Sequence, residues 1–461
     1  MIDPGRVVIV GAGPTGLGAA WRLTELGHRD VTLIDARLGP GGLAASIVDP
    51  AGFTWDIGGH VQFSHYDYYD RVLDSLPLEW LHHERESWIW VKDRFVPYPF
   101  QNNIHRLAEA DRDHALRGLE NRAMGTAANF REWISGTFGE GIAEIFLLPY
   151  NLKVWAWPLE TLSKGWVGER VALPDLARIR RNIAENQDDV SWGPNSTFRF
   201  PMQGGTGAIW EAVARELEPA PFRFGQTVVG VSPARVHLDG GGQVSFDTLI
   251  STVPLVSLVR MTERISDASR RAADSLIHSS THVFGIGLRG DPPAGVGRKC
   301  WMYFPDANSP YYRVTVFSNY SPCNAPKGCW SLMAEVSESA AKPVNGETIF
   351  AAVVAALRQD GLIGATNEIV SRWHHREEFG YPTPFLGRDE VLEQVLPELE
   401  RQRIYSRGRF GAWKYEVSNQ DHSFMQGVEL AERLTGRGEE QTLVDADRAN
   451  SGVFRRASGG R

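Results

Sequence analysis

Residues suited to chemistry gather in the first sixty positions, where glycines recur at spacings that suit a ligand. Gly11, Gly13 and Gly16 form a G-x-G-x-x-G turn after one apolar run, and Asp35 ends the next apolar run. The backbone N–H groups of such a turn, at the start of a helix, bind a pyrophosphate, and a carboxylate at this offset binds a ribose. The spacing therefore predicts a bound dinucleotide.

Two further glycine pairs, Gly41–Gly42 and Gly58–Gly59, follow closely. They favour FAD over NAD, because a buried isoalloxazine ring requires more places where the backbone approaches the ligand. The alternative is that both pairs only form turns. His60 follows the second pair and is either a neighbour of the flavin ring or a packed core histidine. The cofactor-binding residues expected in this region are Gly11, Gly13, Pro14, Thr15, Gly16, Asp35, Ala36, Gly41, Gly42, Leu43, Gly58, Gly59 and His60.

Three arginines have the chemistry to bind an anionic ligand. Arg170, Arg313 and Arg409 lie in separate segments, and none belongs to an acidic run. A guanidinium fork matches phosphate oxygens, although structural and surface arginines are the commoner case. The run PYPFQNN at 97–103 adds an aromatic plane next to amides, which suits a nucleobase. These residues indicate a nucleotide-like ligand without naming one.

The bulk composition excludes several classes of protein. The 461 residues are 42% hydrophobic and 23% charged, and the net charge of −8 argues against a nucleic-acid binder, which needs a basic face. No apolar run reaches the ~20 residues that span a bilayer. The three cysteines lack metal-binding spacing, and their odd number indicates reduced thiols. We expect a cytoplasmic protein with no metal, no secretory signal, and neither membrane nor nucleic-acid partners.

The elements that hold these residues follow from the pattern of apolar positions. Residues 7–35 predict a strand, a helix and a second strand around the glycine turn. In the first half of the chain we further expect strands within 85–100, helices over 104–190, a turn leading into a helix over 193–210, and strands over 222–255. In the second half we expect antiparallel strands over 281–337, a helix near 347–359, an extended run at 368–375, a turn at 380–384, and helices near 389–400 and within 407–434. A polar, mobile tail is expected from about residue 436.

This order of elements predicts an α/β fold with three parts: a Rossmann-like FAD-binding domain, a helical substrate domain and an antiparallel β-sheet domain. The expected division assigns 1–84, 206–265 and 401–435 to the FAD-binding domain, 85–103, 191–205 and 266–400 to the sheet domain, 104–190 to the helical domain and 436–461 to the tail.

Beyond the first sixty residues, the chain resembles one flavoenzyme family along most of its length. The matching runs include GAGPTGLGAA, DIGGHVQFSHY, VPYPFQNNI, LLPYNLKVWAWP, GERVALP, WGPNSTFRFPMQGGTG, YYRVTVFSNYSP and RGRFGAWKYEVSNQDHSFM, which occur in the expected order between residue 7 and about residue 430. Together they resemble the UDP-galactopyranose mutases, in particular the eukaryotic branch of that family. A generic amine-oxidase-type flavoprotein shares little beyond the first sixty residues.

The resemblance implies an isomerase that converts UDP-galactopyranose to UDP-galactofuranose. The sugar ring contracts while its C1 is bonded to N5 of reduced FAD, and no net redox change results. A UDP-sugar is therefore the implied partner. NADPH is a candidate reductant, and a homo-oligomer is a candidate assembly.

The resemblance also implies roles for residues that match the family's motifs. His60, Arg170 and Arg313 match catalytic positions. Those that match cofactor positions near the isoalloxazine and ribityl chain are His60, Arg409, Asn419 and Gln420. Those that match substrate-binding positions are Arg170, Arg313, Tyr381 and Tyr415 for the diphosphate, Tyr98, Phe100, Gln101 and Tyr303 for the uridine, Arg85, Asn195 and Trp301 for the galactose, and Phe146, Asn151 and Trp155 on the helix of the substrate domain.

The segments 167–175 and 191–197 match flaps that close over the substrate, with Gly168, Pro174, Gly193 and Pro194 as hinge residues. Two positions depart from the family: Leu148 and Leu152 stand where the fungal enzymes commonly carry an arginine and an aromatic residue. They motivate a second hypothesis, the same chemistry on a deoxy, amino or pentose sugar nucleotide. An amine-oxidase-like oxidoreductase and an inactive flavin-binding partner protein are further alternatives.

Overall fold

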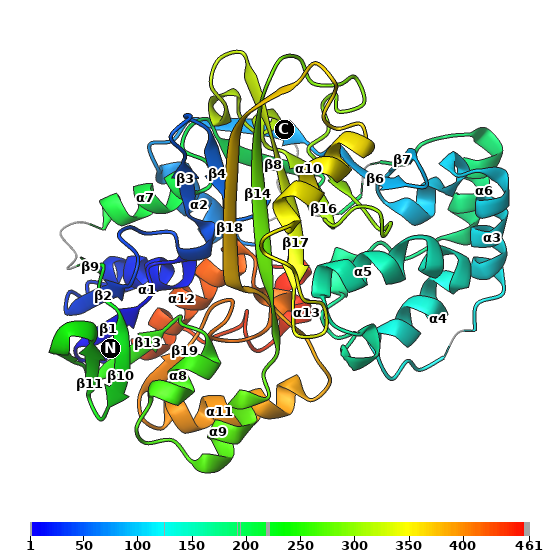
Figure 1. Cartoon of the computed structure of the whole chain (residues 1–461). Coiled ribbons are helices and arrows are strands. Elements are labelled where there is room, and N and C mark those ends of the chain that lie inside the picture. Colours follow the sequence, from blue (N-terminus) through cyan, green and yellow to red (C-terminus); the bar gives the residue numbers. More distant parts are fainter. Residues whose placement is uncertain (1, 124, 191, 194, 218–221, 456–461) are drawn as a thin grey trace.

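The computed structural model describes residues 2–123, 125–190, 192–193, 195–217 and 222–455. Figure 1 shows three parts: helices around a parallel sheet at the lower left, a tall sheet in the centre, and a group of helices at the right. Each part is assembled from segments that are distant in the sequence. The expected α/β class, with parallel and antiparallel sheets and a helical part, is confirmed.

The parallel sheet carries the glycine turn. Its strands lie in the order β19 (Ile404–Ser406), β13 (Thr248–Ser251), β1 (Val7–Val10), β2 (Val31–Asp35) and β9 (Phe222–Phe224), and every pair is parallel. The central strand β1 is buried along its whole length, because helices cover both faces of the sheet. One face packs against α1 (Pro14–Glu25), α2 (Asp67–Ser75), α7 (Gly207–Glu216) and α12 (Gln420–Leu434). The other packs against α8 (Leu255–Met261), α9 (Asp267–Asp274) and α11 (Arg388–Glu400).

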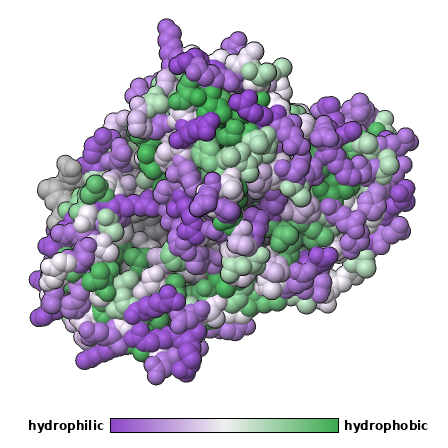
Figure 2. All heavy atoms as spheres, viewed as in Figure 1, coloured by the Kyte–Doolittle hydropathy of each residue, from purple (hydrophilic) through white to green (hydrophobic). Residues whose placement is uncertain are grey.

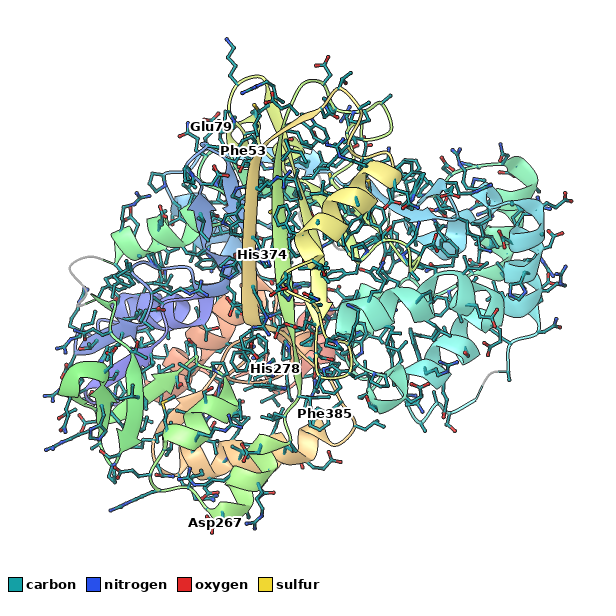
Figure 3. All side chains as sticks on the ribbon, viewed as in Figure 1. Phe53, Glu79, Asp267, His278, His374 and Phe385 are labelled. Carbon is teal, nitrogen blue, oxygen red and sulfur yellow. The ribbon has the colours of Figure 1, made fainter. Side chains whose placement is uncertain are left out.

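The tall sheet supplies the far wall of the site. Its order is β18 (Glu368–Pro382), β14 (His278–Arg289), β17 (Cys329–Glu338), β16 (Arg313–Val316), β15 (Trp301–Tyr303), β6 (Ser87–Val91) and β7 (Arg94–Pro97). All pairs are antiparallel except β15 with β6. Helix α10 (Ile349–Gln359) packs on one face. Figure 3 shows His374 about halfway along β18, while His278 lies at the lower end of the sheet, near the parallel-sheet part.

The helical part consists of α3 (Glu109–Glu120), α4 (Phe130–Ile142), α5 (Leu148–Trp155) and α6 (Leu176–Glu185), with the short turns η2 (Phe100–Arg106) and η5 (Gly168–Arg170). A π-helical turn, Ala143–Leu147, joins α4 to α5. Aromatic side chains such as Phe130, Phe138 and Trp155 form its core together with apolar residues of β6 and β7. The helical part is therefore fixed to the edge of the tall sheet.

Smaller strands complete the fold: β10 (Val228–Ser232), β11 (Arg235–Leu238) and β12 (Gln243–Ser245) form one sheet, and β3 (Ser46–Val48) pairs with β4 (Thr54–Asp56). The segment around 197–201 was expected in the antiparallel sheet domain, but β8 (Thr197–Pro201) pairs instead with β5 (Trp80–Glu84) in a sheet of two strands. The expected turn at 380–384 begins later, because β18 continues through Pro382.

The expected division of the chain places α9 and α11 with the antiparallel sheet, but both helices lie on the parallel sheet. Their residues Ala273, Leu392 and Val395 belong to the same core cluster as Val8 and Leu249. Apolar periodicity predicts that a helix buries one face, but it does not identify the sheet that receives this face.

The expectation of a mobile tail is wrong for residues 436–455. The Thr442 hydroxyl donates to Glu429 at 2.8 Å, and the buried Glu440 pairs with the buried Arg407. Helix α13 (Ala446–Asn450) packs against η5 and η9 (Tyr415–Val417). The polar residues of this segment are ordered because their partners lie in distant parts of the chain.

The surface shows no unusual concentration of one residue type on the face drawn in Figure 2, where apolar residues lie in separate patches among hydrophilic ones. Within the described ranges, no helix combines the length and the apolar character needed to cross a membrane. Cys300, Cys323 and Cys329 are free thiols, as their odd number predicts.

Candidate functional site

A large cavity of about 660 Å³ lies where the three parts meet. Its walls include the glycine turn after β1, the loop after β4, strands β14, β16 and β17, helix α5, the turn η5 and the start of α12. Most residues expected at the site line it: Gly11, Gly13, Pro14, Thr15, Asp35, Gly42, Leu43, Gly58, Gly59, His60, Arg85, Tyr98, Gln101, Phe146, Asn151, Trp155, Arg170, Asn195, Trp301, Tyr303, Arg313, Tyr381, Arg409, Tyr415, Asn419 and Gln420.

The expected site residues that do not line the cavity are Gly16, Ala36, Gly41 and Phe100. Gly16 permits close packing, because a Cβ there would lie 1.9 Å from the carbonyl oxygen of Gly11. Gly41 has a φ of +108° and donates its N–H to the carbonyl of Ala12 in the first glycine turn, so it fixes the shape of the second turn. Phe100 is fully buried behind the wall, with its ring 5.0 Å from that of Phe146.

The glycine turn has the geometry of an anion site. Gly11 has a φ of +106°, and a Cβ there would lie 1.9 Å from Thr252 Oγ1, so only glycine fits. Gly13 is the N-cap of α1, whose first turn faces the cavity. Asp35 accepts the N–H of Ala12 at 2.6 Å, which fixes its carboxylate beside the turn. This part of the cavity can therefore hold a pyrophosphate and a ribose.

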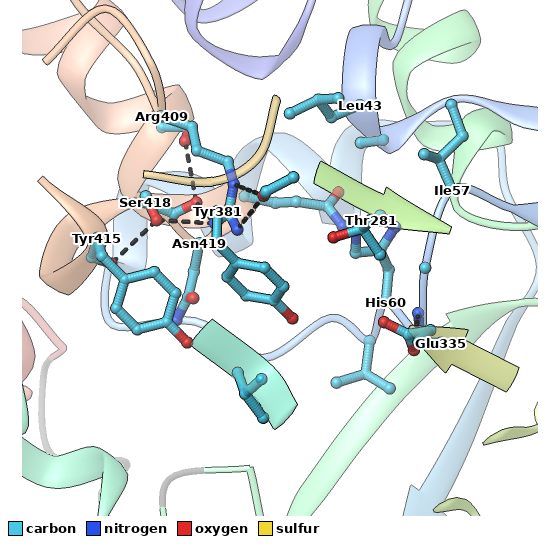
Figure 4. A pocket seen from close by; sticks show the side chains of 18 of the residues that line it. Leu43, Ile57, His60, Thr281, Glu335, Tyr381, Arg409, Tyr415, Ser418 and Asn419 are labelled. Carbon is cyan, nitrogen blue, oxygen red and sulfur yellow. Dashed lines mark hydrogen bonds between the residues drawn. The ribbon is translucent and has the colours of Figure 1, made fainter. Parts of the chain in front are cut away.

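His60 lies in the loop after β4 and lines the cavity, rather than only filling the core. Its Nδ1 is buried and has no hydrogen-bond partner among the residues that the structure describes. Burial lowers the pKa of His60 to about 4, so the ring is neutral at neutral pH. Figure 4 shows His60 close to Thr281 and Glu335. A neutral imidazole with a buried, unpartnered Nδ1 is available to a bound group.

Arg313 has a buried carboxylate partner, Glu335, that was not among the residues expected at the site. Its Nε and Nη2 donate to the two oxygens of Glu335 at 2.7 and 2.8 Å. Burial alone would raise the pKa of Glu335, but Arg313 lowers it below its usual value, so the carboxylate is ionised. The Tyr312 hydroxyl and the Gly59 N–H also donate to Glu335. Arg313 therefore faces the cavity in a fixed orientation.

Arg409 is a partly buried cation whose hydrogen-bond partners are neutral groups. Its guanidinium donates to the carbonyl of Gly380 at 2.9 Å and to Ser418 Oγ at 2.8 Å, and it lies 5.1 Å from the ring of Tyr381 (Figure 4). Burial lowers the pKa of Arg409. Among the ion pairs of the described residues, none includes Arg409. A charge in this setting favours an anion in the cavity.

Arg170 lies on the turn η5 and approaches the same tyrosine, Tyr415, as Arg409. Its Nη2 donates to the carbonyl of Glu416 at 2.6 Å, and its guanidinium lies 5.6 Å from the ring of Tyr415. Its Nη1 is 3.4 Å from Asn450 Oδ1. No carboxylate among the described parts of the chain forms an ion pair with Arg170. Arg170 and Arg409 thus both approach Tyr415 and leave positive charge in the cavity.

Trp192 and Asn195, from the second expected flap, line the cavity next to Arg85. The Arg85 guanidinium donates to Asn195 Oδ1 and to the carbonyl of Trp192, and it lies 5.0 Å from the ring of Tyr98. The expected hinge Pro194 lies outside the described residues. In this structure Asn195 and Trp192 thus lie against the cavity wall.

Aromatic rings form the wall on the side of the helical part. The rings of Tyr98 and Tyr303 are 5.7 Å apart, and Trp301 Nε1 donates to Tyr303 Oη at 2.6 Å. The ring of Trp155 is 4.9 Å from that of Tyr415 and 5.9 Å from that of Tyr381. Gln101 is buried, and its amide donates to the carbonyl of Ala172. Such a wall can stack a nucleobase.

The two positions that depart from the resembling family lie outside this wall. Leu148 packs on the core of the helical part, and Leu152 is 46% exposed; neither lines the cavity. The hypothesis of a different sugar nucleotide therefore loses the observation that motivated it.

Several lining residues were missed by the sequence analysis: Arg37, Tyr150, Trp166, Glu169, Trp192, Thr281, Tyr312, Glu335, Glu377 and Asp421. Glu335 had a usable signal, because it is an acidic residue within the apolar run CWSLMAEV. A lone carboxylate in a buried strand requires a partner. The others carry no comparable signal in their local sequence.

Comparison with known proteins agrees with this geometry. Residues 14–435 match the family of flavin-containing amine oxidoreductases. The chain is 50% identical to a reduced UDP-galactopyranose mutase, over 97% of both chains, with a TM-score of 0.95. A CLA-producing fatty acid isomerase from P. acnes, 16% identical over 94% of this chain and 99% of the other with a TM-score of 0.64, shares the fold. Putrescine oxidase bound to putrescine, 17% identical over 94% and 99% of the two chains with a TM-score of 0.61, shares it too. The chain therefore belongs to the UDP-galactopyranose mutase family, within the flavin-containing amine oxidoreductases.

Proposed function

We propose that this protein converts UDP-galactopyranose to UDP-galactofuranose at a reduced FAD, without net oxidation of the sugar. The relative that it matches over 97% of its length is a reduced UDP-galactopyranose mutase. The observation that carries the proposal is a single cavity that joins a dinucleotide-binding turn to Arg170 and Arg409, neither of which forms an ion pair with a carboxylate among the described residues. An amine oxidase needs the dinucleotide turn but has no use for the arginines, because its substrate is a cation.

The residues around the glycine turn fit FAD. The first turn of α1, capped at Gly13, suits the pyrophosphate, and Asp35 suits the ribose. At the ring end, His60 Nδ1 is a buried polar atom without a partner among the described residues, and Asn419 is the N-cap residue of α12 in the cavity wall, where its side chain makes no capping hydrogen bond. When bound in its reduced form, FAD supplies the nucleophile for the anomeric carbon.

Arg170, Arg313 and the two tyrosines of the cavity, Tyr381 and Tyr415, suit the diphosphate of the substrate. Arg170 and Arg313 would each direct donors at phosphate oxygens, and the two tyrosines add hydroxyl groups. The diphosphate leaves and returns during ring contraction, so it must stay in place while the sugar is detached. Arginines held by Glu335 and by the Glu416 carbonyl meet this need, because they do not reorganise when the charge appears.

The remaining wall divides into a nucleoside end and a sugar end. Tyr98 and Tyr303 would stack the uracil, with Gln101 near its polar edge. Arg85, Asn195 and Trp301 would contact the galactose, and Phe146, Asn151 and Trp155 would shape the cavity between the two ends. His60, neutral at working pH, would orient groups at the ring by hydrogen bonding rather than by charge.

The test is to incubate the dithionite-reduced holoenzyme with UDP-galactofuranose and to separate the products. We expect UDP-galactopyranose to form without oxygen consumption, and the oxidised enzyme to form none. Failure to form the pyranose, in a sample with an intact flavin spectrum, contradicts the proposal. Bleaching of the flavin by NADPH without oxygen tests the reductant separately, since dithionite makes the mutase assay independent of it.

A further inference from the structure

His65 connects two walls of the cavity, although it belongs to neither the cofactor-binding nor the substrate-binding set. Its backbone N–H and its Nδ1 both lie near Asp421 Oδ2, at 3.0 and 2.7 Å. Its Nε2 lies 2.6 Å from Glu169 Oε1. The side chains of His65 and Asp421 are 3% and 1% exposed, and that of Glu169 is 25% exposed. One imidazole therefore bridges the first turn of α12 and the turn η5.

The bridge requires a charged imidazole, because both ring nitrogens donate only in the protonated form. Burial lowers the pKa of His65, but the hydrogen bonds to Asp421 and Glu169 raise it to about 9. The ring of His422 stacks on that of His65 at 4.6 Å, and burial lowers the pKa of His422 to about 3, so this neighbour is neutral. The charged and titratable groups around the stacked pair are Asp421, Glu169, Arg170 and Tyr66.

The position of Glu169 in the sequence connects the His65 bridge to Arg170. Glu169 immediately precedes Arg170 in a turn of three residues, so fixing one carboxylate fixes the backbone from which the arginine extends. On the other side, His65 lies in the loop that carries His60, and Asp421 lies in the first turn of α12. The imidazolium thus links the arginine on η5 to the elements that face the flavin end.

We propose that His65 is a positioning residue that holds Glu169 and thereby keeps Arg170 in place over the cavity. The three elements joined at this point are the loop after β4, the N-terminus of α12 and the turn η5. The inference rests on the proposed function in one respect: the ligand beside Arg170 carries a diphosphate. UDP alone is therefore a sufficient probe.

The first test measures UDP binding to the oxidised holoenzyme of the Glu169→Gln variant. The change in flavin fluorescence on adding UDP gives the Kd. Glu169 is partly exposed, so the variant should fold and retain its flavin. We expect the Kd for UDP to rise about tenfold, as for the loss of one charge-assisted hydrogen bond. Glu160→Gln is the matched control, because Glu160 is an exposed glutamate paired with Arg131 away from the cavity, and it should bind UDP like the wild type.

Steady-state kinetics and a second variant separate positioning from general damage. In His65→Gln and in Glu169→Gln, KM should rise about tenfold while kcat changes by less than threefold, because Arg170 is displaced but not removed. The double variant should be no worse than the single variants, because both remove the same bridge. A kcat loss without a KM change overturns the proposal.

The dependence of the UDP Kd on pH distinguishes a positioning role of His65 from a purely structural one, because a purely structural role would leave this dependence unchanged. As the pH rises through about 9, His65 loses a proton and can donate from only one nitrogen, so wild-type affinity for UDP should fall towards that of Glu169→Gln. The Kd ratio between variant and wild type should thus approach one at high pH. Ionisation of the uracil affects both proteins equally and cancels in this ratio.

A UDP affinity in both variants equal to that of the wild type, with intact flavin spectra, overturns the role of His65. This outcome is distinct from failure of the proposed function. If the wild type forms no UDP-galactopyranose, the proposed function fails, while UDP affinity still decides the role of His65.

Discussion

Arg313 and Glu335 face each other across the antiparallel strands β16 and β17, and their side chains form two parallel hydrogen bonds of 2.7 and 2.8 Å. Glu335 also accepts the N–H of Gly59 at 3.1 Å. One buried carboxylate therefore orients both a cavity arginine and the loop that carries His60. Among the described residues, Nη1 of Arg313 makes no hydrogen bond and remains available to a ligand.

Glu335→Gln should destabilise the protein and weaken substrate binding. The change leaves the partly buried Arg313 without its counterion; breaking a fully buried pair typically costs about 3–5 kcal/mol, which sets an upper limit here because Arg313 is 22% exposed. We expect a lower thermal midpoint of the holoenzyme and a raised KM. Glu368→Gln is the control, because its pair with Arg289 is exposed and such pairs contribute about 0–1 kcal/mol. Equal midpoints for the two variants would contradict the importance of the pair.

Arg313→Lys should lower kcat despite keeping the charge. A lysine cannot donate to both oxygens of Glu335 and also present a planar donor to the diphosphate. The loss of one fixed donor to a developing charge typically lowers kcat by about 10²–10³. Product analysis with reduced enzyme measures the effect. Arg289→Lys, at an exposed position on β14, should retain full turnover.

Gly11→Ala should abolish flavin binding. The position has a φ of +106°, and the added Cβ would lie 1.9 Å from Thr252 Oγ1, so the turn cannot keep its shape. The ratio of flavin to protein after purification is the measurement. Gly27→Ala is a matched control: it has a φ of +83° but nothing within 4 Å of the added Cβ, so it should keep its flavin at a cost of about 1 kcal/mol in stability.

His60→Asn should change how stability depends on pH. The folded pKa of about 4 lies below the ordinary value of 6.5, so the unfolded chain takes up the proton first as the pH falls. Wild-type stability should therefore fall between pH 6.5 and 4, relative to the variant, by roughly 3 kcal/mol at most.

Thermal midpoints of both holoenzymes across this pH window measure that difference. His82→Asn, on the exposed edge of β5, controls for a change in histidine content. A wild-type profile parallel to that of His60→Asn would show that His60 takes up its proton as readily in the folded protein as in the unfolded chain.

Local patterns in the sequence were sufficient to predict the fold class and the dinucleotide turn. The apolar run of β1, the spacing of Gly11 and Gly13, and the position of Asp35 all follow from short-range geometry. The aromatic run at 97–103 and the separated arginines likewise carry their chemistry in their side chains. These features depend on neighbours within a few residues, which is why the sequence alone determines them.

Only the tertiary structure decided which charges are compensated. Glu335 pairs with Arg313 because two strands align in register, and His65 meets Glu169 and Asp421 because three distant segments converge. Residues 436–455 are likewise held in place by hydrogen bonds and ion pairs to distant segments of the chain. A hydrogen bond between distant segments depends on the packing of the whole chain, and no local pattern specifies its partner. The sequence thus determined the chemical groups of the site, and packing determined which of them remain free to bind a ligand.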